Sequence, residues 1–152
     1  MSFQSHNHRQ CIERGVKHAT DRCDEAGLQL TPIRQRVLEL LLTEHRALGA
    51  YEILEMLRKD GLNSQPPVAY RALDFLVQHG FAHKIERLNA FIACTTPETD
   101  HAPAFLICRV CEAVSEIHPQ LSRGALGRTA KDAGFVIEQA IVEAEGVCPN
   151  CR

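Results

Sequence analysis

The chain has 152 residues, a formal net charge of −2 and an apolar content of 45%, which is typical of a folded globular protein and argues against intrinsic disorder. Its apolar runs are far shorter than the ~18 residues that a membrane span requires, and its polar N-terminus lacks the apolar core of a secretory signal. We therefore expect a cytoplasmic protein with no membrane partner. Acidic residues exceed basic ones only after residue 94, so any nucleic-acid-binding face is expected before that point.

The first 94 residues are predicted to form four helices followed by a β-hairpin. Apolar side chains recur at helical spacing in each predicted helix, and the Thr31-Pro32 step supplies a hydroxyl cap followed by proline at the first helical position. Asn89 is a suitable residue for the turn of the hairpin. The predicted elements are helices over Gln10–Ala26, from Thr31-Pro32 onward, over Ala50–Lys59 and over Pro66–His79, and strands over Phe81–Glu86 and Ala90–Thr95.

Short helices followed by a hairpin are the order of elements in a winged helix-turn-helix, with Pro66–His79 as the recognition helix. The first turns of that helix carry Tyr70 and Arg71. Arginine can donate two hydrogen bonds to guanine, and tyrosine can contact a thymine methyl group or a phosphate. The alternative from the pattern alone is a helical core in which Tyr70 packs and Arg71 is solvated.

The second part of the chain is predicted to be a small α+β unit. Residues 95–103, rich in Thr, Pro, Asp and Glu, are expected to form a linker between a first part at 1–94 and a second part at 104–152. The unit is too small for comfortable stability alone, so we expect a metal and an oligomer interface to stabilise it. Its predicted elements are strands over Phe105–Cys108 and Ala113–Ile117, a helix over Pro119–Ala133 and a strand over Phe135–Glu143.

Two Cys-x-x-Cys pairs are the strongest chemical signal in the sequence. They consist of Cys108 and Cys111 and of Cys148 and Cys151. In a reducing compartment such thiols favour metal binding over disulfides, and two pairs complete the tetrahedral sulfur shell that suits Zn²⁺. A redox dithiol, iron, and no metal at all are the alternatives. Duplication of the pair argues against the redox dithiol, which usually uses a single activated thiol.

A second metal site is predicted at the junction of the two parts. His83 and Cys94 lie on the expected hairpin, His101 lies in the linker, and Glu116 follows the first cysteine pair. Each residue alone has a structural explanation, but together they offer two nitrogens, one sulfur and one oxygen, which zinc accepts. A thiolate disfavours Mn²⁺ and Mg²⁺ without excluding Fe²⁺. His118 is the alternative to Glu116, and the weaker candidates are His6, His8, Cys11, His18, Cys23, His45 and His79.

Several strings of the sequence resemble the ferric uptake regulator family, and within it the zinc uptake regulators. The recognition-helix string and the spaced cysteine pairs are the most specific of them. The others are the motifs that open the second and third helices and the residues around the junction site. The matching strings are Leu30-Thr31-Pro32-Ile33-Arg34, Ala50-Tyr51-Glu52-Ile53-Leu54, the eleven residues from Pro66 to Leu76, and His83-Lys84-Ile85-Glu86.

The resemblance implies a winged helix joined by a hinge to a dimerisation domain. It also implies a dimeric, zinc-responsive repressor at operators of zinc-uptake genes, with neither enzymatic activity nor a small organic substrate. Two zinc sites per chain are implied, structural at the four cysteines and sensing at the junction residues, with DNA contacts from Tyr51, Tyr70 and Arg71.

The sequence departs from the family in two places, and two other functions remain open. Ala102-Pro103-Ala104-Phe105 replaces a His/Asp-rich stretch of iron-sensing members, which makes a third metal site doubtful, and Val68-Ala69 replaces the usual Thr-Val. An iron- or peroxide-sensing member of the family is the first alternative. A zinc- or thiol-dependent oxidoreductase that uses the cysteine pairs is the second.

Overall fold

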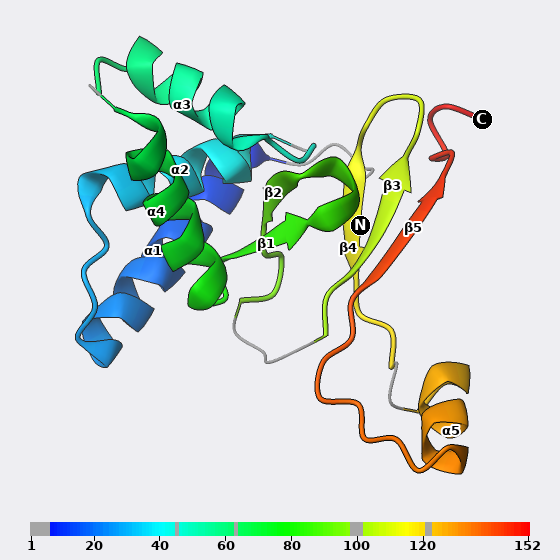
Figure 1. Cartoon of the computed structure of the whole chain (residues 1–152). Helices are drawn as coiled ribbons and strands as arrows, with labels where there is room; N and C mark the ends of the chain where they lie inside the picture. The colour runs from blue at the N-terminus through cyan, green and yellow to red at the C-terminus, as the bar shows by residue number, and fades with distance from the viewer. Residues whose placement is uncertain (1–6, 45, 63, 98–101, 121–122) are drawn as a thin grey trace.

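The computed structural model describes residues 7–44, 46–62, 64–97, 102–120 and 123–152 (Figure 1). A helical unit with a β-hairpin lies beside a three-stranded sheet, and a short helix extends away from that sheet. The elements of the first unit are α1 (His8–Ala26), α2 (Pro32–Thr43), α3 (Ala50–Lys59), α4 (Pro66–Gln78), β1 (Ala82–Ile85), the 3₁₀ turn η1 (Glu86–Leu88) and β2 (Ala90–Ala93). Those of the second are β3 (Ala104–Cys108), β4 (Val114–Ile117), α5 (Ala125–Asp132) and β5 (Val142–Gly146).

Local capping sets the starts of the first two helices. The Asn7 side chain accepts a hydrogen bond from the Arg9 amide at 3.1 Å, so α1 begins at His8 rather than at the predicted Gln10. The Thr31 hydroxyl accepts from the Arg34 amide at 3.3 Å, and Pro32 occupies the first position of α2 as predicted. None of the helices in the described part of the chain combines the length and apolar character that crossing a lipid bilayer requires.

The first unit is a winged helix-turn-helix, as the sequence predicts. Helices α2, α3 and α4 bury their apolar faces in one core, with Val37, Ile53 and Leu73 fully inaccessible. Strands β1 and β2 form the antiparallel hairpin, and Asn89 adopts the left-handed conformation (φ 45°) at its turn. A further bridge between Leu48 and Phe91 attaches the segment before α3 to this hairpin.

The second unit is the predicted α+β fold, with strand order β4-β3-β5. Strand β3 pairs antiparallel with β4 and parallel with β5. An apolar cluster joins the hairpin to this sheet, so the two units share buried surface. Its members are Ala47, Ile85, Ala90, Ile92, Phe105, Ile107 and Val114.

Two predicted elements of the second unit are wrong in their bounds. The last strand is Val142–Gly146 instead of Phe135–Glu143, because only its later residues pair with β3, and Phe135 and Val136 remain 66% and 80% exposed without a strand partner. The apolar pattern alone does not show which residues find a partner. Helix α5 begins at Ala125 instead of Pro119, after Gly124 in an extended conformation.

Candidate metal centres and nucleic-acid interface

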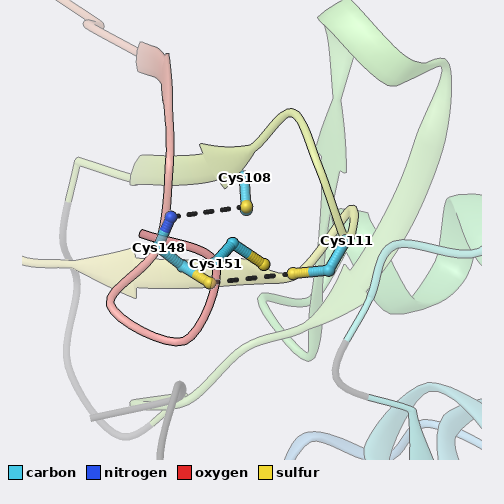
Figure 2. A group of neighbouring side chains, drawn as sticks. All are labelled: Cys108, Cys111, Cys148 and Cys151. Atoms are coloured by element: carbon cyan, nitrogen blue, oxygen red, sulfur yellow. Dashed lines mark hydrogen bonds between the residues drawn. The ribbon is translucent and has the colours of Figure 1, made fainter.

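The two cysteine pairs meet because β3 and β5 run parallel. Their register places Cys108 opposite Gly146, so the segments after the two strands begin at the same end of the sheet. The Arg109 amide donates a hydrogen bond to the Gly146 carbonyl at 2.9 Å and holds the two strand ends together. Cys108 is the last residue of β3 and Cys111 lies in the turn that follows it, whereas Cys148 and Cys151 follow β5, and the four sulfur atoms converge (Figure 2). We call Cys108, Cys111, Cys148 and Cys151 the cysteine cluster.

The geometry and protonation of the cysteine cluster fit a soft cation. All four sulfur atoms lie within 4.8 Å of one another, and Cys111 Sγ is 3.7 Å from Cys148 Sγ. Backbone amides of Cys111 and Cys148 donate hydrogen bonds to Cys108, which lowers its pKa to about 6, and the Cys148 amide lies 3.4 Å from its sulfur. Hydrogen bonding with Cys148 raises the pKa of Cys151 to about 12. Four adjacent thiolates require a positive ion between them, and tetrahedral sulfur coordination suits zinc.

A second group of ligand atoms forms where the hairpin meets the sheet. His83 on β1, Cys94 immediately after β2 and Glu116 on β4 place one ligand atom each within 4.8 Å of the others, and we call these three residues the junction site. The Nε2 atom of His83 lies 3.0 Å from the Glu116 carboxylate, and Cys94 Sγ lies 3.8 Å from it. The Thr95 amide and hydroxyl donate to the other carboxylate oxygen at 2.9 and 3.0 Å.

The chemistry of the junction site also fits a metal ion. The Glu116 residue is 7% exposed, and a buried carboxylate is costly unless it is paired or binds a metal. Burial and the neighbouring Glu116 carboxylate raise the pKa of Cys94 to about 12, so the metal-free thiol carries its proton at neutral pH. Imidazole, thiolate and carboxylate form a mixed donor set that zinc accepts in tetrahedral geometry. Zinc bound there would join ligands from both units of the chain.

The structure brings together three of the four residues predicted for the junction site. The fourth, His101, lies outside the described residues, as do His6 and His45. The alternative ligand His118 is not part of the group, and its Nε2 lies 3.3 Å from the Thr96 hydroxyl. Of the weaker candidates, Cys11, His18 and Cys23 lie on α1 and His79 packs its ring against Phe75. Sequence reasoning missed Thr95, whose only signal is that it follows Cys94.

The predicted DNA-contacting side chains lie on the surface of the helix-turn-helix. Tyr70 and Arg71 are exposed near the start of α4, and Tyr51, at the start of α3, is 67% exposed. Buried residues on the opposite face of α4, including Leu73 and Leu76, hold it against α2 and α3. This packing leaves the first turns of α4 accessible to a groove of DNA.

Comparison with known proteins agrees with the fold. The model of the ferric uptake regulator family matches residues 25–144. The chain belongs to this family. It is 35% identical over 130 residues to the zinc uptake regulation protein of Escherichia coli, a match that covers 85% of this chain and 76% of that protein. These similarities place it among the zinc uptake regulators of the family.

Solved structures give the same assignment and also bear on the conformation. A zinc uptake regulator complexed with zinc and DNA superposes with a TM-score of 0.85 at 33% identity, covering 92% of this chain and 94% of that one. Holo XcZur superposes with a TM-score of 0.78 at 39% identity, covering 90% of this chain and 95% of that one. Apo XcZur superposes with a TM-score of only 0.55 at 38% identity, covering 93% of this chain and 98% of that one. As a whole, this chain therefore superposes more closely on the holo protein and the DNA complex than on the apo protein.

Proposed function

We propose that this family member is a zinc-responsive transcriptional repressor whose zinc-loaded dimer binds operators of zinc-uptake genes. The observation that carries the proposal is the composition of the junction site. His83 and Cys94 belong to the DNA-binding unit, whereas Glu116 belongs to the sheet of the other unit. A ligand that needs all three residues stabilises one arrangement of the two units, with residues 95–103 as the hinge.

Each metal group has a separate role in this proposal. The cysteine cluster lies within one unit and acts as a structural zinc site that holds the C-terminal turn against the end of β3. The junction site is the sensing site, and the predicted fourth ligand is His101. By linkage, zinc at the junction strengthens DNA binding and DNA strengthens zinc binding by the same factor.

A dimer is supported by apolar side chains that the single chain leaves uncovered. Helix α5 buries none of its own side chains, and Leu126 on it is 51% exposed. Phe135, Val136 and Ile141 are exposed in the segment that leads to β5. Large exposed apolar side chains gathered in one unit are typical of an interaction surface. A two-fold dimer would present two copies of α4 to an operator of roughly palindromic sequence.

In this proposal DNA is read by the start of α4. Arg71 donates to a base or a phosphate, Tyr70 contacts the backbone or a thymine methyl group, and Tyr51 on α3 contacts the backbone. Operation on chromosomal DNA implies a cytoplasmic location. It requires neither an enzymatic reaction nor a small organic substrate.

The alternative functions have less support in the structure. An oxidoreductase would place one activated thiol of a Cys-x-x-Cys pair at a helix N-terminus, whereas both pairs here lie at the ends of strands and face each other. An iron sensor would favour harder ligands than the buried thiol of Cys94.

Titration of a DNA fragment at fixed free metal concentrations tests the proposal. Operator binding should rise with free Zn²⁺ and respond much less to Fe²⁺ and Mn²⁺. Thiol titration should find the cysteine cluster protected by tightly held zinc. Equal operator affinity with and without zinc, or a stronger response to Fe²⁺, would contradict the proposed function.

A further inference from the structure

The turn of the hairpin is held by a side chain from the other unit. Glu143 on β5 accepts hydrogen bonds from the backbone amides of Glu86 and Arg87, at 2.7 and 3.0 Å. These amides belong to the first turn of η1, where backbone N–H groups lack partners within the helix. The carboxylate therefore caps the turn across a sequence separation of 57 residues. Charge-assisted hydrogen bonds of this kind are stronger than neutral ones.

An ion pair lies next to this cap. Arg87 Nε is 3.0 Å from the Glu145 carboxylate, with the two side chains 53% and 38% exposed. Exposed ion pairs contribute little on their own, so Glu145 adds orientation rather than most of the energy. We call the contacts of Glu143 with the two amides the wing latch.

The hairpin is thus attached to the sheet at both ends. The junction site binds it at the open end, through His83 and the residue that follows β2. The wing latch binds it at the turn, and the shared apolar cluster lies between the two. Figure 1 shows the hairpin lying between the helices and the three-stranded sheet. The first attachment contains the three candidate metal ligands together with the hydrogen bonds from Thr95 to Glu116, whereas the second consists of hydrogen bonds within the chain alone.

We propose that Glu143 is a positioning residue for DNA binding, because the wing latch stabilises the same arrangement of the two units that the junction site stabilises. The inference rests on the proposed function. It is supported by the superposition, since the conformation that contains the latch matches the zinc and DNA complex at a TM-score of 0.85 and the apo protein at 0.55. A contact that favours this arrangement of the two units lowers the zinc concentration that is needed to populate it.

Substitution of Glu143 in the full-length protein, with zinc retained at the cysteine cluster, tests the proposal. Glu143→Gln loses the charge and directs an amide N–H toward a backbone donor. Glu143→Asp keeps the charge but withdraws it from the turn, and serves if the first variant does not fold. Glu145→Gln removes only the exposed ion pair, and Glu25→Gln on α1 matches the change in charge at an exposed carboxylate far along the chain from the hairpin.

Two measurements are needed for each variant. The first is the free Zn²⁺ concentration at half-maximal operator binding. The second is the Zn²⁺ affinity of the junction site without DNA. In Glu143→Gln the free Zn²⁺ concentration at half-maximal operator binding should rise about three- to tenfold, and the Zn²⁺ affinity of the junction site should fall by a similar factor. The effect is smaller than for a fully buried charged hydrogen bond because Glu143 is only half-buried. Glu145→Gln should change these two quantities less, and Glu25→Gln should leave them unchanged. At saturating zinc the operator affinity should return to the wild-type value.

The outcomes separate the latch from a general structural role. An unchanged zinc midpoint in both Glu143 variants would overturn the proposal. So would an equal loss of operator affinity at every zinc concentration accompanied by a lower unfolding temperature. If the wild-type chain shows no zinc-stimulated DNA binding, the proposed function fails. The zinc affinity measured without DNA still tests the latch in that case.

Discussion

The two candidate metal groups of this molecule differ both in their ligands and in the way the fold assembles them. All four residues of the cysteine cluster lie at one end of a single sheet, where a parallel pair of strands brings them together. The junction site takes His83 and Cys94 from one unit and Glu116 from another. A metal within one unit contributes to the folding of that unit. A metal shared by two units contributes to their relative position, which is the quantity a DNA-binding dimer must control.

Loss of a cluster ligand should have the largest effect. Structural zinc contributes about 10–16 kcal/mol of apparent binding free energy in small domains, which equals or exceeds the stability of a typical domain. We expect Cys108→Ser to unfold the C-terminal unit or make the protein monomeric. Thermal unfolding, zinc content and sedimentation would measure this, with Cys23→Ser on α1 as the control for loss of a buried thiol outside both sites. A dimeric Cys108→Ser protein with native stability would show that the cluster is not structural.

Loss of a junction ligand should leave the fold intact and remove the response to zinc. Cys94→Ser should keep the dimer and the cluster zinc, because neither depends on the hinge. The coupling free energy between two linked binding sites is typically about 1–3 kcal/mol per binding event, and the contributions of the two junction sites of a dimer can add. Operator binding with and without zinc measures the coupling, and the zinc content of the cluster is the internal control. If Cys94→Ser and His83→Ala both keep the wild-type response, the sensing site lies elsewhere, and His6, His8, Cys11 and His18 become the next candidates.

The contrast between the two groups also explains how far the sequence predicts the structure. The cysteine cluster is predictable because paired cysteines at a fixed spacing have few other uses, and the bounds of α3 follow from its apolar spacing. The last strand is not predictable from its own residues, because its position depends on the register with β3. The wing latch is even less predictable from the sequence, since the partners of Glu143 are backbone amides, which carry no sequence signal.

A substitution on α4 should affect DNA binding while leaving both metal groups unchanged. Arg71 is exposed and belongs to neither site, so Arg71→Ala should keep the zinc content and the dimer. We expect specific operator affinity to fall by about 1–3 kcal/mol if the contact is to guanine, with a smaller effect on nonspecific DNA. Competition binding with operator and unrelated DNA measures the difference. Unchanged operator affinity would exclude Arg71 from sequence recognition.

The protonation state of Cys94 makes zinc binding at the junction depend on pH. Burial and the Glu116 carboxylate raise the pKa of Cys94 to about 12, so this thiol is protonated throughout the neutral range when no metal is bound. Zinc binds the thiolate, so ligation releases this proton, and each unit of acidification should weaken the apparent affinity about tenfold, or about 1.4 kcal/mol. The cysteine cluster should retain its zinc over the same range, because structural zinc sites bind with about 10–16 kcal/mol of apparent free energy.

Calorimetry in two buffers of different ionisation enthalpy measures the number of protons released. The protein is titrated with Zn²⁺ after its cluster has been filled. We expect Cys94 to contribute about one proton per chain, because its pKa of about 12 lies well above the pH of the experiment. Cys94→Ser should lose that proton together with most of the affinity, since a serine hydroxyl does not replace the thiolate. Affinity that stays constant between about pH 6.5 and 8 would show that the Cys94 thiolate does not ligate the ion. The distinction between the two metal groups would then have to rest on His83 and Glu116 alone.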